Sequence, residues 1–207
     1  MKVSFSTIKY VIAGTLISGA IGASRLSAQP KTQSAFDTFE KTGISPKGCN
    51  NGLLPKNIPS PKIKINGQNK IAKFVVDLSQ NVLYSYDNSG NVTNAYLVAS
   101  GKKSTPTTSG VRVVSHIETY PYRTAPRRTK RRRNPRAYGP KIICLDRLDV
   151  KTGERSQIGE FIHGNNDSTS IGEYASKGCI RMDNEVIKEL AGYVKNGDIV
   201  VILPNKN

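Results

Sequence analysis

From residue 70 onward the chain is a series of short apolar runs separated by turn-forming residues, and this pattern limits its fold more than any other feature. The runs cover residues 71–78, 82–86, 96–98, 111–117, 141–148, 158–162 and 199–203. Val82, Tyr84 and Tyr86 recur at every second position, and residues 87–91 (DNSGN) supply a turn, as in a β-hairpin. Many short strands at close spacing favour a mainly β fold, a sandwich or barrel, over alternating strands and helices.

One helix is expected near the C-terminus. Asp183 can cap its first turn, and Gly197 stands where a glycine often follows a helix. Apolar residues recur along one side of this segment, as in a helix that packs on a sheet. They are Val186, Ile187, Leu190, Ala191 and Val194.

The first 28 residues resemble an export signal. Lys2 and Lys9 precede an uncharged apolar run at 11–23, which is shorter than the roughly 20 residues that span a bilayer. We therefore predict that residues 1–28 form a signal peptide or a membrane anchor, with a buried globular helix as the weaker alternative. The rest of the chain is then expected outside the cytoplasm, in the periplasm or cell wall. Prolines interrupt residues 29–69, which we interpret as an irregular linker before a domain at 70–204.

A strongly basic segment interrupts the domain. Lys and Arg number 31 against 15 Asp and Glu, a net charge of +16, and residues 123–136 (RTAPRRTKRRRNPR) hold eight cations and no acid. Such a run predicts a solvated, mobile insertion, either without a ligand or bound to a polyanion such as a wall polymer or anionic lipid. The candidate polyanion-binding residues are Arg127, Arg128, Lys130, Arg131, Arg132 and Arg133. The export signal and the lack of aromatic residues within the segment argue against nucleic acid.

Histidine and cysteine are scarce, with two and three residues. No metalloprotease, zinc-finger or phosphate-loop motif occurs, so no metal or organic cofactor is expected. An oxidising compartment would permit a Cys49–Cys144 disulfide, but Cys144 lies in an apolar run and is better explained as a buried thiol. We interpret His116 as a structural or solvent-facing residue.

The remaining histidine and cysteine form a chemically suggestive pair. An apolar run ends at His163, Gly164 follows, and Cys179 comes 16 residues later in the sequence SKGC. Gly178 permits a tight turn that could direct backbone amides at one point, and Arg181 adds a fixed positive charge. A thiol, a base and an anion-stabilising turn are the components of acyl transfer.

Residues 163–182 (HGNNDSTSIGEYASKGCIRM) closely resemble the signature of the L,D-transpeptidase (YkuD-type) catalytic domain, with H-G, I-G and S-x-G-C-[IV]-R in order. The resemblance extends upstream to residues 100–102 (SGK), 105–107 (TPT) and 138–140 (YGP), and covers about 71–203. Departures from the family pattern are Lys177, Asn165, Ser168 and Thr108, none of which replaces a reacting group.

The resemblance implies a β-sandwich of mixed strands with a catalytic loop at one end. Cys179 would be the nucleophile, His163 its base, and the Gly178 and Cys179 amides the oxyanion hole. The residues that would bind substrate or shape its pocket are Gly164, Ser176, Lys177 and Arg181.

The substrate implied is a peptidoglycan tetrapeptide stem. The thiol would displace D-alanine, and the amine of a second stem would resolve the thioester as a 3→3 cross-link. Water in place of the amine would give an L,D-carboxypeptidase, and a non-catalytic basic wall-binding protein is the third alternative.

Overall fold

The computed structural model describes residues 35–50 and 54–205. The strands are β1 (Cys49–Asn50), β2 (Lys62–Ile65), β3 (Gln68–Ile71), β4 (Phe74–Asp77), β5 (Val82–Tyr86), β6 (Val92–Leu97), β7 (Ser100–Gly101), β8 (Gly110–Thr119), β9 (Lys141–Leu148), β10 (Arg155–His163), β11 (Tyr174–Ser176), β12 (Ile180–Arg181) and β13 (Ile199–Leu203). The helices are α1 (Ala35–Thr42), α2 (Lys130–Arg133) and α3 (Asn184–Tyr193), with short 3-10 helices η2 (Pro135–Tyr138) and η3 (Ser168–Ser170). No helix within the described ranges is long and apolar enough to cross a membrane.

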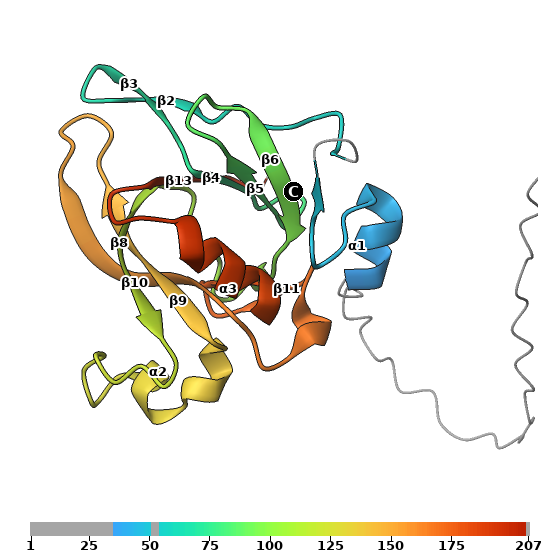
Figure 1. Ribbon diagram of the computed structural model, residues 1–207, viewed down its shortest axis with the longest axis vertical. Coiled ribbons are helices and arrows are strands. Elements are labelled where there is room, and N and C mark those ends of the chain that lie inside the picture. Colours follow the sequence, from blue (N-terminus) through green and yellow to red (C-terminus); the bar gives the residue numbers. More distant parts are fainter. Residues whose placement is uncertain (1–34, 51–53, 206–207) are drawn as a thin grey trace, which may run out of the picture. The chain divides into compact units, whose positions relative to one another are not determined.

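Nine of the described strands form one curved mixed sheet in the order β1-β6-β5-β4-β13-β8-β9-β10-β12 (Figure 1). Strand β13 runs parallel to β4, and β12 runs parallel to β10, while the other neighbours are antiparallel. Two-stranded pairs β7–β11 and β2–β3 complete the strands. The predicted fold class, mainly β with mixed strands and a C-terminal helix, is confirmed.

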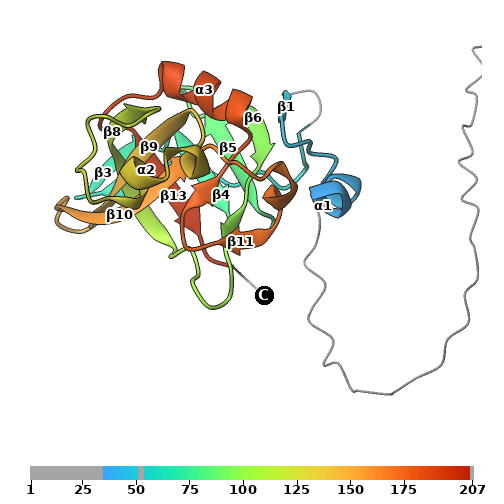
Figure 2. The same ribbon diagram turned by 90° about the horizontal axis from the view of Figure 1, so that it is seen from below.

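Side chains from the sheet are buried on both of its faces. In β4, Phe74 and Val76 join the cluster that contains α3, whereas Val75 between them joins a second cluster with Val82 and Tyr84 of β5. This follows from the two-residue period of a strand, which sends neighbouring side chains to opposite faces. Helix α3 lies along one side of the sheet in Figure 2.

Helix α3 begins as the sequence predicts but ends earlier. The Asp183 carboxylate accepts hydrogen bonds from the amides of Glu185 and Val186, as an N-cap does. The helix ends at Tyr193, so Gly197 does not follow its last turn. Gly197 instead lies in the turn before β13 with a φ of +94°, a backbone conformation that favours glycine.

Residues 29–69 are more regular than the sequence suggested. Within the described part they contain α1, β1, β2 and the first residues of β3. Strand β1 extends the main sheet by pairing with β6, and Ile44 is buried in the same cluster as Tyr84. The description of this segment as an irregular linker is therefore wrong for these residues. The predicted export segment, 1–28, lies outside the described residues.

The basic segment is also partly folded, contrary to the prediction of a mobile loop. It contains α2 and the start of η2, Ala125 is buried, and Arg131 is only 15% exposed. The reason is a contact that short-range sequence patterns do not reveal: Arg131 pairs with the buried Glu118 of β8. Exposed cations remain at Arg127, Arg128, Lys130 and Arg133.

Candidate active site

Two neighbouring parallel strands bring the candidate catalytic residues together. In the register of β10 and β12, His163 lies opposite Arg181 and Ile162 opposite Ile180. Cys179 immediately precedes β12 and is therefore level with Phe161. Side chains two residues apart share a face of a sheet. The face that carries Phe161 and His163 of β10 therefore also carries Cys179 and Arg181. His163, Cys179 and Arg181 all line one pocket of about 440 Å³.

The His163 ring is set up to accept a proton on one nitrogen. Its Nδ1 lies 2.5 Å from the carbonyl oxygen of Gly164, which can only accept a hydrogen bond. The proton therefore resides on Nδ1, and Nε2 carries the lone pair. Burial lowers the pKa of His163 to about 4, and the nearby Arg181 charge acts in the same direction. The ring is thus neutral at physiological pH.

Cys179 sits on a turn that is fixed by hydrogen bonds to its neighbours. The Ser176 hydroxyl donates to the Cys179 carbonyl at 2.6 Å and accepts from the Gly178 amide at 3.1 Å. Gly178 has a φ of +110°, a conformation that favours glycine. Because its amide already has an acceptor, Gly178 does not present a free oxyanion-hole donor here, contrary to the expectation. Within the described residues, no hydrogen bond occupies the Cys179 amide.

The upstream sequence element supports this turn from the other side. The Thr107 hydroxyl donates to the Gly178 carbonyl at 2.8 Å and accepts from the Gly101 amide at 2.8 Å. A Cβ atom at Gly101 would lie 2.3 Å from the Thr105 carbonyl oxygen and the Thr107 amide nitrogen. The SGK and TPT motifs therefore hold the cysteine turn through close backbone packing.

The Cys179 thiol is protonated at rest. Burial raises the pKa of Cys179, whereas a backbone hydrogen bond from Phe161 and the Arg181 charge partly oppose that rise. Within the described part of the chain no hydrogen bond joins the thiol to the His163 ring. The site thus combines a neutral thiol and a neutral imidazole in one pocket.

A second set of residues, which sequence reasoning did not assign to the site, holds the His163 turn. The Tyr138 ring lies 4.8 Å from the His163 ring, centroid to centroid. Asn184 pairs both ends of its amide with the backbone of Asn165 at 2.8 Å. A Cβ atom at Gly164 would lie 2.4 Å from the Asn184 side-chain oxygen, which explains the glycine after the histidine. The YGP motif pointed to Tyr138, but nothing in the sequence singled out Asn184.

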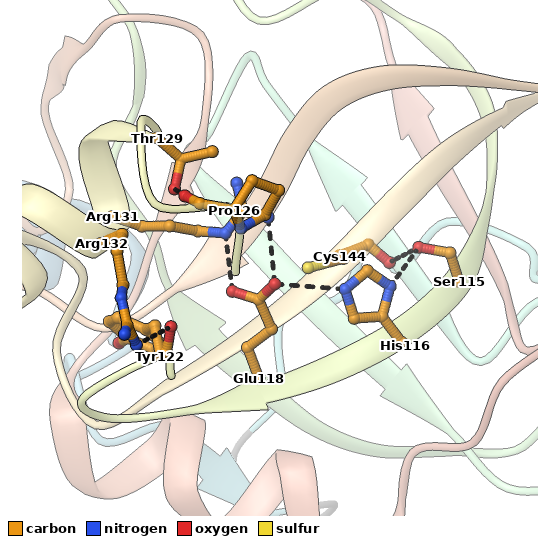
Figure 3. Close-up of polar contacts among 9 residues, drawn as sticks. All are labelled: Ser115, His116, Glu118, Tyr122, Pro126, Thr129, Arg131, Arg132 and Cys144. Atoms are coloured by element: carbon orange, nitrogen blue, oxygen red, sulfur yellow. Dashed lines mark hydrogen bonds and ion pairs between the residues drawn. The ribbon is translucent and has the colours of Figure 1, made fainter. Parts of the chain in front are cut away.

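The basic segment forms one wall of the pocket. Thr129, Lys130 and Arg131 line it together with Lys177 and Arg181. Arg131 donates to both carboxylate oxygens of Glu118, at 2.6 and 3.0 Å, as Figure 3 shows. Although burial alone would raise the pKa of Glu118, hydrogen bonds from Arg131 and His116 lower it overall.

His116, Glu118 and Cys144 place potential metal-ligating atoms within 4.8 Å of one another, the one such group among the described residues. The Glu118 charge is already balanced by Arg131, and burial raises the pKa of Cys144 to about 12. Glu118 and Arg131 therefore form an ion pair, with His116 and the protonated thiol of Cys144 next to the carboxylate. His116 is largely exposed, as predicted, and its Nε2 lies 3.3 Å from Glu118. Cys49 and Cys144 belong to different hydrophobic clusters and do not form the disulfide considered above.

Residues 72–202 match the family model of the L,D-transpeptidase catalytic domain, YkuD. The chain belongs to the YkuD family. Over 43 residues it is 54% identical to the YkuD protein of Bacillus licheniformis, and over 41 residues it is 56% identical to that of Bacillus subtilis. These stretches cover 21% and 20% of this chain and 26% and 25% of the two relatives. The chain thus matches about a quarter of their length.

Among solved structures, an Enterococcus faecium L,D-transpeptidase is 25% identical to this YkuD chain, with a TM-score of 0.46. The similarity covers 64% of this chain and 49% of the other. The predicted catalytic-domain family is confirmed by the family match, which includes every pocket-lining residue named above.

Proposed function

We propose that this YkuD chain is an exported cysteine L,D-transpeptidase that joins peptidoglycan stem peptides. The observation that carries the proposal is the shared pocket of Cys179 and His163 on one face of the β10–β12 pair. Membership of the family supports the reaction class. The charged and apolar pattern of residues 1–28 supports a location outside the cytoplasm.

In the acylation step, the free Nε2 of His163 accepts the thiol proton as the Cys179 sulfur attacks the carbonyl carbon of the third stem residue. The new negative charge on oxygen is stabilised by the Cys179 amide and by the positive field of Arg181. The imidazolium then returns the proton to the departing amine, the C–N bond breaks, and D-alanine leaves.

The second step regenerates the enzyme. An amine of another stem attacks the thioester, its excess proton passes through His163 to the sulfur, and a new amide bond links the two third residues. Since the thiol and the imidazole are both neutral beforehand, the thiol proton moves to His163 as the carbon–sulfur bond forms, and a proton returns to the sulfur as that bond breaks. No thiolate–imidazolium pair is needed in the resting protein.

Mass spectrometry of the intact protein tests the acylation step. Incubation with a purified disaccharide-tetrapeptide or a carbapenem should add one acyl group to the protein. Cys179→Ala should abolish the adduct, and Cys144→Ala, which removes a buried thiol outside the pocket lining, should keep it. An adduct that survives Cys179→Ala, or no adduct on the unmodified protein, would reject the assignment.

Product analysis tests the acceptor. A 3→3-linked dimer with an equal amount of free D-alanine is the expected result. Tripeptide and D-alanine without any dimer would identify a carboxypeptidase that uses the same thioester.

A further inference from the structure

The pocket around Cys179 is lined by four cationic residues and by no acidic one. The cations are Lys130, Arg131, Lys177 and Arg181. Low-dielectric walls concentrate the field of such a group, so the pocket attracts anions. In addition, the buried Nε of Arg181 has no hydrogen-bond acceptor within the described residues. The pocket therefore offers unneutralised positive charge next to the thiol.

Arg131 and Lys130 have different roles despite being neighbours. The charge of Arg131 is balanced by Glu118 (Figure 3). Its guanidinium also lies 5.0 Å from the centroid of the Phe161 ring. These two contacts fix α2 against β8 and β10. Lys130, the preceding residue, is exposed, lines the pocket and makes no ion pair in the part of the chain that the structure describes.

We infer that Lys130 is a carboxylate-binding residue of the pocket and that Arg131 and Glu118 hold it there. Resting on the proposed function, the ligand is the free C-terminal carboxylate of the donor tetrapeptide. That carboxylate belongs to the departing residue and lies only one residue beyond the bond that Cys179 attacks. The ammonium group of Lys130 binds the carboxylate at the end of the stem. A donor peptide that lacks this carboxylate, or carries it one residue farther along, therefore fits less well.

This role also distinguishes Lys130 from the rest of the basic segment. Arg127, Arg128 and Arg133 are exposed but do not line the pocket. Arg133 belongs to the same four-residue helix as Lys130 and carries the same charge. It is therefore a matched control for any general electrostatic effect of the segment.

Binding to the full-length Cys179→Ala protein tests the inference without any chemistry. Calorimetry would compare a tetrapeptide stem with a free C-terminal carboxylate and the same stem with a C-terminal amide. We expect the free acid to bind more tightly, and Lys130→Ala to weaken its binding about fivefold while leaving the amide unchanged, as for an exposed charge pair. Lys130→Arg should retain the preference for the acid, and Arg133→Ala should retain it fully.

Equal weakening of both peptides by Lys130→Ala would overturn the inference, because it would indicate a structural effect on the pocket. The same loss in Arg133→Ala, or no measurable binding of either peptide, would overturn it too. Absence of turnover by the unmodified protein would contradict the proposed function alone, since the binding preference needs no thioester.

Discussion

Buried His163 should make the protein less stable in mild acid. Its pKa is about 4 in the folded protein and about 6.5 in an unfolded chain. Since the folded value is the lower one, the unfolded chain takes up a proton first as the pH falls. The stabilising contribution is therefore complete above about pH 6.5 and is lost as the pH falls towards about 4.

The expected size of this loss follows from the two pKa values. Between about pH 7.5 and about pH 5, the free energy of unfolding should fall by about 2 kcal/mol through His163 alone. Most unfolded-state carboxyl groups titrate below this window, so they contribute little to the change. Urea unfolding at both pH values, followed by circular dichroism, measures the difference.

The chain provides its own control, because it contains only two histidines. His163→Gln should remove most of the fall in stability between the two pH values. His116→Gln should keep it, since the His116 side chain is 56% exposed. A full 2 kcal/mol loss in His163→Gln would refute the assignment of a buried neutral ring.

Three further outcomes are expected. Arg131→Met should lower the free energy of unfolding by about 3 kcal/mol, because it leaves the buried Glu118 carboxylate with only the exposed His116 as a partner. The double variant with Glu118→Gln should recover much of that loss in urea unfolding, and an additive double variant would contradict this reasoning. Gly101→Ala should lower the free energy of unfolding by about 1–3 kcal/mol, because the added Cβ clashes with the backbone of residues 105–107. Gly192→Ala in α3, where the space is open, should be neutral or stabilising. Equal effects of the two substitutions would argue against the clash. The rate at which iodoacetamide alkylates Cys179 should keep rising with pH beyond the pH range in which an ordinary thiol ionises, because burial raises the pKa of Cys179. Arg181→Gln should move this pH–rate profile to still higher pH. A profile like that of an ordinary thiol would show that burial does not raise the pKa.

The strands could be predicted well because their apolar patterns are local. Residues 141–148 and 199–203 are strands with the predicted bounds, and the Asp183 cap is confirmed. The pairing of distant strands, which brings His163 close to Cys179, could be predicted only through the family signature. Spacing alone permitted the contact and could not establish it.

The errors concern contacts between distant residues. Composition predicted that residues 123–136 would be solvated, since nothing within the segment can neutralise its charge. Glu118, which does so for Arg131, is separated by a turn and belongs to a strand. Likewise, the prolines of residues 29–69 led to the prediction of an irregular linker, and β1 was missed because its pairing with β6 depends on tertiary structure. Local patterns therefore describe the sheet better than the rim of the pocket.

The ion pair that ties α2 to β8 has a consequence for how this protein can change over evolutionary time. With Arg131 holding the segment to Glu118, exposed neighbours such as Arg128 and Arg133 can be exchanged while the sheet stays intact. On the proposed role of Lys130, the contact to the stem carboxylate then lies on a segment that can vary while His163 and Cys179 keep their places on the β10–β12 pair.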